Sequence, residues 1–152
     1  MTIDRSTPDL GALYQGVIVD HFRKPRNQGR VDPHDTDIEM RNPSCGDEIR
    51  LQMRLEDGRI AVVGFTGSGC AISQASSSMM TDLVKGKTPD EALALARRFT
   101  EMVHGDEAAA KDKALGQARV LQGVSKFADR VKCSMLAWDA LQESLKQVRG
   151  AG

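Results

Sequence analysis

Apolar residues near the start of the chain recur at steps of three and four positions. This spacing places them on one side of a helix, so the segment 10–22 is predicted to be an amphipathic helix. Pro25 ends the predicted helix, because a proline cannot donate to the helical hydrogen-bond ladder. The basic stretch 24–29 and the polar stretch 31–37 are expected to be irregular. The apolar positions are Leu10, Leu13, Tyr14, Val17, Ile18 and Phe22.

In the next part of the chain, apolar and polar residues alternate. The segment 49–55 shows the alternation of a half-buried strand, and a second apolar segment follows at 60–66. Between them, Asp57-Gly58 favours a two-residue type I′ turn, which makes the two segments a hairpin. The segment 37–42 is expected to add a third strand at the edge. The predicted cross-strand pairs are Leu55 with Ile60, Met53 with Val62, and Leu51 with Gly64.

Helical patterns dominate the second half of the chain. Helices are predicted over 71–85, from a capping box at 88–91 to about 105, and over 133–148. The Ala- and Lys-rich stretch 106–123 is less periodic and is interpreted as a loop with partial helix. Together the elements predict an α+β fold, in which a small three-stranded antiparallel sheet packs against helices.

Composition narrows the classes of function. The 152 residues suit one domain, and 21 basic side chains balance 21 acidic ones, so the formal net charge is zero. This balance, with 4% aromatic residues, argues against a nucleic-acid-binding protein. No stretch approaches the roughly 20 apolar residues of a membrane span. The polar N-terminus does not resemble a secretory signal, so a cytoplasmic protein with reduced thiols is expected.

The chain has three cysteines, and each lies in a local sequence that suggests a site. Cys45 follows a Pro-containing turn, Cys70 follows a glycine loop before a predicted helix, and Cys133 has basic neighbours. Asp47 follows Cys45 with a single glycine between them, so both side chains could reach one ion. Three thiolates and a carboxylate provide four donors, the number that tetrahedral Zn²⁺ requires.

Each of these residues also has an ordinary structural interpretation. Isolated cysteines are commonly small buried apolar residues, and an aspartate in a turn commonly caps its own backbone. His21 is expected on the surface or half-buried on the first helix rather than as a ligand. Arg130 could support the site or a partner, or be simply solvated. Ser73 and the run 76–78 are expected to serve helix surface and packing, not nucleophilic catalysis.

Local sequences around these residues form a series of motifs that spans most of the chain. They are Leu13-Tyr14-Gln15, Pro25-Arg26-Asn27-Gln28-Gly29, Asn42-Pro43-Ser44-Cys45-Gly46-Asp47, Gly67-Ser68-Gly69-Cys70-Ala71-Ile72-Ser73 and Arg130-Val131-Lys132-Cys133. In this order they resemble the U-type iron–sulfur cluster assembly proteins. The resemblance implies a single U-type domain over 1–152 with an insertion at about 106–123.

Within that family, the chain is similar to the SufU-type subgroup of zinc-dependent sulfurtransferases. The scaffold subgroup has a histidine before the third cysteine, where this chain has Lys132, and it lacks the insertion. The resemblance implies a Zn²⁺ ion held by Cys45, Asp47, Cys70 and Cys133. It also implies that Cys45 accepts persulfide sulfur from a SufS-type cysteine desulfurase and relays it to downstream iron–sulfur scaffold components.

Three other functions are weighed against sulfur transfer. The same donors could hold iron or a 2Fe–2S cluster, which would make the protein a scaffold for cluster assembly and transfer. The metal could also be purely structural, in a zinc-stabilised interaction module. A cysteine hydrolase is disfavoured, because none of the three histidines has a setting that suggests a general base.

Overall fold

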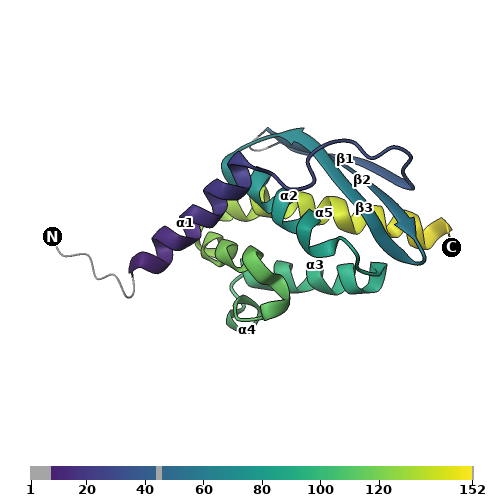
Figure 1. Ribbon diagram of the computed structural model, residues 1–152. Helices are drawn as coiled ribbons and strands as arrows, with labels where there is room; N and C mark the ends of the chain where they lie inside the picture. The colour runs from purple at the N-terminus through teal and green to yellow at the C-terminus, as the bar shows by residue number, and fades with distance from the viewer. Residues whose placement is uncertain (1–7, 44–45, 152) are drawn as a thin grey trace.

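The computed structural model describes the backbone of residues 8–43 and 46–151, and the side chains of residues 15–43 and 46–148. A three-stranded antiparallel sheet, in the order β1-β2-β3, lies on one side, and helices cover one of its faces (Figure 1). This arrangement confirms the predicted α+β fold. The elements are α1 (Pro8–Arg23), β1 (Thr36–Asn42), β2 (Asp47–Glu56), β3 (Arg59–Ser68), α2 (Ala71–Val84), α3 (Pro89–Val103), α4 (Glu107–Ala110), the 3₁₀ segment η1 (Lys113–Lys126) and α5 (Ala128–Ala151).

The β2–β3 hairpin closes with the predicted turn. Asp57 and Gly58 have φ values of 53° and 75°, the two positive values that a type I′ turn requires. Next to the turn, Leu55 pairs with Ile60 as predicted.

Beyond that first pair, the predicted register is wrong by one residue. Met53 pairs with Val63, and Leu51 pairs with Phe65. The register shifts at Arg54/Leu55, where Ala61 is the extra residue of a β-bulge. The extra residue keeps Val63 and Phe65 in the core.

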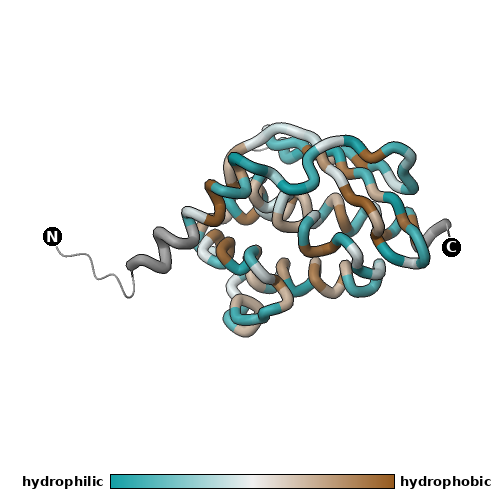
Figure 2. The backbone as a smooth tube through the Cα atoms, in the orientation of Figure 1, coloured by the Kyte–Doolittle hydropathy of each residue, from teal (hydrophilic) through white to brown (hydrophobic). Residues whose placement is uncertain are grey.

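The core lies between the sheet and the helices, where the apolar residues gather (Figure 2). α5 packs against β1 and β2, while α2 packs against β3. On the far side of α5, Trp138 stacks on Phe99 of α3 with ring centroids 4.5 Å apart. The capping box predicted at the start of α3 is present: Thr88 accepts from the Glu91 amide, and the Glu91 carboxylate accepts from the Thr88 amide. In the described part of the chain, no helix has the length and apolar character needed to cross a lipid bilayer.

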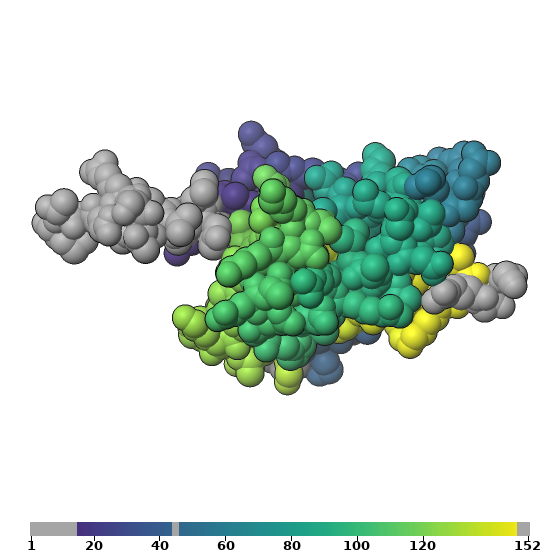
Figure 3. Space-filling model, turned by 90° about the horizontal axis from the view of Figure 1, so that it is seen from below, coloured from purple at the N-terminus to yellow at the C-terminus, as the bar shows by residue number. Residues whose placement is uncertain are grey.

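The stretch 106–123, predicted to be a loop with partial helix, is instead ordered structure that contributes to the core. It contains α4 and most of η1, and it borders α3 on the face seen from below (Figure 3). η1 consists of two short helical pieces joined at Gly116, whose φ of 50° and ψ of −131° are not helical. After this kink, Ala118, Leu121 and Val124 are buried at every third position, the period of a 3₁₀ helix, and Leu115 is buried before it.

A buried polar network holds α1, α2 and η1 together. His21, only 1% exposed, lies with Nδ1 2.7 Å from Ser78 Oγ and Nε2 2.6 Å from Gln117 Oε1. Ser78 Oγ also accepts a hydrogen bond from the Arg26 amide. His21 is thus a structural residue, and the predicted surface or half-buried position is wrong.

The serines of α2 are also more buried than predicted. Ser73 and the run 76–78 serve packing, as expected, but none is on the surface. Ser76 Oγ donates to the Ser134 carbonyl of α5 at 2.6 Å, so it ties the two helices that approach the candidate site.

The segment after α1 adds its backbone to the outer edge of β3. The Gly29 amide donates to the Phe65 carbonyl, and the Phe65 amide donates to the Asn27 carbonyl, at 2.8 and 3.1 Å. Gly64 permits this approach, because a Cβ atom there would lie 2.6 Å from the Gly29 oxygen. β3 is therefore covered on this side, which leaves β1 at the open edge of the sheet.

Candidate metal centre

Three potential metal ligands from different elements meet at one end of the sheet. They are Asp47, the first residue of β2, Cys70, immediately before α2, and Cys133, in the second turn of α5. One ligand atom from each lies within 4.8 Å of the others. Asp47 and Cys133 are 1% and 3% exposed, whereas Cys70 is half-buried. Solvent can therefore reach the group of ligands at Cys70 but not at Asp47 or Cys133.

Strand pairing explains why these residues converge. Asn42 pairs with Asp47 at the end of β1–β2, and Glu48 pairs with Ser68 at the end of β2–β3. The hairpin therefore returns the chain to the level of Asp47 just before Cys70. Cys45, the remaining predicted ligand, lies outside the described residues.

A hydrogen bond fixes the orientation of the Asp47 carboxylate. The Cys70 amide donates to Asp47 Oδ1 at 2.9 Å, and Cys70 Sγ lies 3.9 Å from Asp47 Oδ2. Gly69 is needed for this packing, because a Cβ atom there would lie 2.5 Å from Oδ1. One oxygen is thus satisfied by the backbone, and the other faces the Cys70 sulfur.

The sulfur of Cys70 lies at the N-terminal end of α2. Cys70 is the N-cap residue of α2, and its sulfur accepts from the Ser73 amide at 3.4 Å. The first turn of α2 contains no acidic residue, whereas the Asp47 carboxylate of β2 lies beside the sulfur. A bound metal ion would hold this sulfur as a thiolate, the form in which cysteine ligates metals.

The spacing and chemistry of the three donors fit a tetrahedral metal ion. With metal–sulfur bonds of about 2.3 Å, neighbouring ligand atoms of a tetrahedron are about 3.8 Å apart. The largest separation here is 4.8 Å, so a side-chain movement of about 1 Å would close the site. Two sulfurs and one carboxylate oxygen suit Zn²⁺ or iron, and either metal requires a further ligand.

The residues just before Cys133 belong to the first turns of α5 and are not among the three grouped ligands. α5 begins at Ala128, not at Cys133 as predicted, so Cys133 is held within the helix. Arg130 is exposed and lines a shallow surface hollow with Phe127. Its backbone amide donates to the Phe127 carbonyl at 2.9 Å, but its guanidinium makes no hydrogen bond or ion pair with the described residues. Its role in the site therefore stays a prediction.

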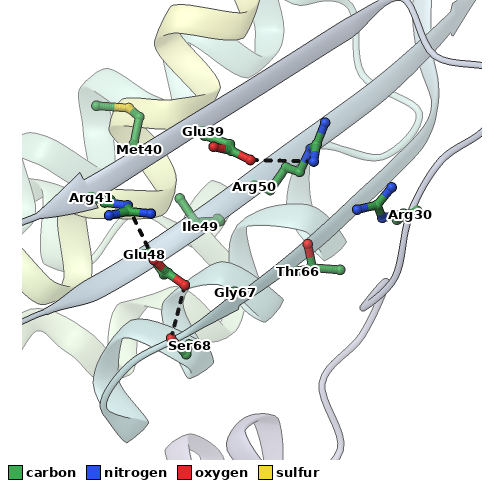
Figure 4. A pocket seen from close by; sticks show the side chains of 10 residues that line it. All are labelled: Arg30, Glu39, Met40, Arg41, Glu48, Ile49, Arg50, Thr66, Gly67 and Ser68. Carbon is green, nitrogen blue, oxygen red and sulfur yellow. Dashed lines mark hydrogen bonds and ion pairs between the residues drawn. The ribbon is translucent and has the colours of Figure 1, made fainter.

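A second hollow lies on the outer face of the sheet, next to the site (Figure 4). It has a volume of about 370 Å³ and is lined by Arg30, Arg41 and Arg50, of which the last two have acidic partners. Arg41 lies 3.4 Å from Glu48, and Arg50 lies 3.4 Å from Glu39. Arg50 also pairs with Asp37, which lowers the pKa of that carboxyl to about 2. The guanidiniums of Arg41 and Arg50 are thus already engaged, whereas that of Arg30 has no ion pair with the described residues.

Comparison with known proteins gives concordant matches over most of the chain. Residues 13–134 match the model of the family described as NifU-like N terminal domain. The chain is 48% identical to the iron-sulfur cluster assembly scaffold protein IscU of Streptococcus pyogenes serotype M1, over 93% of this chain and 88% of that protein. It is 42% identical to the zinc-dependent sulfurtransferase SufU of Bacillus subtilis (strain 168), over 93% and 95%.

A solved structure of a related protein also matches the chain in fold. The crystal structure described as an iron-sulfur cluster assembly scaffold protein for the SUF system, from Fervidobacterium islandicum AW-1, superposes with a TM-score of 0.79. The match is 35% identical in sequence and covers 85% of this chain and 93% of that one.

Proposed function

The chain belongs to the NifU-like N-terminal domain family of iron–sulfur cluster assembly proteins, and on this premise we propose that it is a zinc-dependent sulfurtransferase of the SufU type. In this proposal Cys45, Asp47, Cys70 and Cys133 hold one Zn²⁺ ion, and Cys45 accepts sulfur. The observation that carries it is the grouping of Asp47, Cys70 and Cys133 within 4.8 Å. Cys45 precedes Asp47 by two residues, so the covalent chain keeps their Cα atoms within about 7 Å of each other.

The metal supplies acidity to its ligands: bound thiols are held as thiolates at neutral pH, where a free thiol is largely protonated. In the proposed reaction, the Cys45 thiolate attacks the outer sulfur of a persulfide on a SufS-type cysteine desulfurase. A sulfur–sulfur bond forms at Cys45, and the donor's own sulfur–sulfur bond breaks. The electron pair of the broken bond leaves on the donor cysteine as a thiolate, so no external oxidant or reductant is needed. The sulfur then passes to downstream scaffold components.

The assignment of roles among the ligands follows from how each is held. Cys70 is anchored at the start of α2, and Cys133 lies inside α5, so both are suited to keep the metal. Cys45 stands between Pro43 and Gly46 in the sequence, residue types typical of turns, and we propose it as the ligand that leaves to react. Asp47 is fixed by the Cys70 amide and completes the set. The exposed cations Lys132 and Arg130 would offset part of the negative charge.

A scaffold for 2Fe–2S assembly is the second candidate. It is favoured by the relationship to the Streptococcus pyogenes protein, whose name describes a scaffold. Zinc is preferred because Lys132 stands directly before Cys133, and an ammonium cannot ligate a metal. We further propose a single domain over 1–152, with 106–123 as an insertion, that acts in the cytoplasm.

Metal analysis of protein purified in air tests the proposal. About one zinc per chain and no visible absorption band are expected from four ligands. A brown protein with iron and sulfide in place of zinc would support the scaffold function instead. The Cys70→Ser variant should retain little metal under the same conditions, which shows whether the metal occupies this site.

A further inference from the structure

A groove of about 450 Å³ runs beside the candidate metal centre. The end of β1 forms one wall, the last turn of α3 forms the other, and α5 forms the floor. We call it the β1–α5 groove. Its apolar lining includes Met40, Val131, Met135 and Leu136, and Lys132 and Asp139 are polar positions on the floor.

The groove is continuous with the metal centre at one end. Lys132, in its lining, directly precedes Cys133. Asn42, on its β1 side, is the strand partner of Asp47. A chain lying in the groove would therefore reach the ligands with one end.

The wall formed by β1 is suited to bind an extended segment. Within the described part of the chain, β2 is the only strand that pairs with β1. An edge strand presents backbone N–H and C=O groups that a strand from another protein can pair with. Alternate side chains of that added strand would then point toward the floor of the groove.

The charges on the floor indicate the chemistry of the occupant. Asp139 is half-buried, and its carboxyl has no hydrogen bond or ion pair with the described residues. Burial, with a smaller contribution from Glu143, raises the pKa of Asp139, as expected for a carboxylate that lacks a cation. Lys132 is two helical turns away, about 10 Å along α5, at the metal end. A bound segment would be complementary if it carried a cation at the Asp139 end.

We propose that the β1–α5 groove docks an extended segment of the sulfur-donor protein. The segment adds to the edge of β1, buries an apolar side chain against Met40 and Met135, and places a lysine or arginine on the Asp139 carboxylate. The spacing from Asp139 to the metal end equals about three extended residues, which brings a donor persulfide to the thiolates. This inference rests on the proposed sulfur transfer.

The test compares a protein donor with a small donor. Sulfur transfer to the zinc-loaded chain is measured from a cysteine desulfurase and, separately, from glutathione persulfide, which is too small to need the groove. Asp139→Lys should raise the KM for the desulfurase about tenfold, because it replaces attraction by repulsion. Asp139→Asn, which preserves the side-chain shape, should raise it about threefold. Transfer from glutathione persulfide should stay at the wild-type rate in both variants.

Asp82→Lys is the matched control, with the same change of charge at an exposed position of α2 outside the groove. Its KM should stay within about twofold of wild type. An unchanged KM in Asp139→Lys would overturn the docking proposal while sulfur transfer stands. So would an equal loss with both donors, since that indicates damage to the thiolates.

Direct binding of the desulfurase, measured by titration calorimetry, decides the question independently of turnover. Asp139→Lys should weaken binding about tenfold, and Asp82→Lys should not. If Asp139→Lys binds the desulfurase as tightly as the wild-type chain, or if the wild-type chain does not bind it, the groove is not the docking site. If the wild-type chain self-associates and Asp139→Lys does not, the groove belongs to a second copy of the chain and the proposal is overturned. Failure of wild type with both sulfur donors would contradict the proposed function itself.

Discussion

The backbone amide of Cys70 donates a hydrogen bond of 2.9 Å to Oδ1 of Asp47, so one proposed ligand orients another. The bond leaves Asp47 Oδ2 as the oxygen that faces the sulfur of Cys70. A hydrogen bond to a metal ligand fixes the orientation of that ligand and contributes to metal affinity. They also make the ligand geometry depend on Gly69, which bears no ligand atom of its own.

Gly69→Ala should therefore weaken metal binding without removing a donor. The added methyl group would meet the Asp47 carboxylate at 2.5 Å and displace it. We expect a loss of zinc affinity of about ten- to a hundredfold, measured by competition with a chromophoric chelator. The absorption spectrum of the Co²⁺-substituted variant should resemble that of Asp47→Ala.

Gly123→Ala provides the control for that experiment, because a Cβ atom at Gly123 would meet nothing within 4 Å. It should bind zinc like the wild-type protein. A Gly69→Ala variant with wild-type affinity and a wild-type cobalt spectrum would show that Asp47 is not positioned in this way.

Removal of the metal should loosen the end of the molecule where the sheet meets α2 and α5. Asp47, Cys70 and Cys133 come from these three elements, and a shared ion would link them. Chelation is expected to lower the melting temperature by about 5 °C or more. Circular dichroism with and without chelator measures this shift, and the metal-poor Cys133→Ser variant should show almost none. An unchanged melting curve after confirmed metal loss would contradict the structural role.

The Asp37–Arg50 pair on the sheet should make stability depend on pH in the acid range. Arg50 donates two hydrogen bonds to Asp37 and lowers the pKa of that carboxyl from 3.8 to about 2 in the folded protein. Because the folded pKa is the lower one, the stabilisation is complete above about pH 4 and is lost as the pH falls toward 2.

Urea unfolding of metal-free protein from pH 5 to pH 2 measures this dependence. Asp37→Asn should unfold more easily at pH 5 and should lose less stability than wild type on acidification. Equal pH dependence in the two proteins would show that the pair does not contribute.

How far the sequence predicts the structure differs from element to element. The hairpin turn was predictable because Asp57-Gly58 is a strong local signal. The bulge at Ala61 was not, because it depends on which side chains of β3 pack into the core, and that is a tertiary property. The 3₁₀ segment has no α-helical period, so the pattern of an amphipathic α-helix does not predict it. The steps from Ala118 to Leu121 and Val124 are the signal that indicates it.

For the site, sequence motifs identified the residues but not their contacts. The meeting of Asp47 with Cys70 follows from the hairpin and was predictable. The approach of Cys133 depends on how α5 packs across the sheet, a tertiary arrangement that spacing alone does not contain. The role of Gly69 was likewise not predictable, because a glycine before a cysteine does not indicate which side chain packs against it.

Mass spectrometric mapping of the persulfide shows which cysteine accepts the sulfur. The zinc-loaded chain is incubated with a cysteine desulfurase and cysteine, separated, alkylated and digested. The account predicts one additional sulfur on the peptide containing Cys45 and none after Cys45→Ser, provided that this variant is loaded with zinc. A persulfide found reproducibly on Cys70 or Cys133, with Cys45 unmodified, would contradict it.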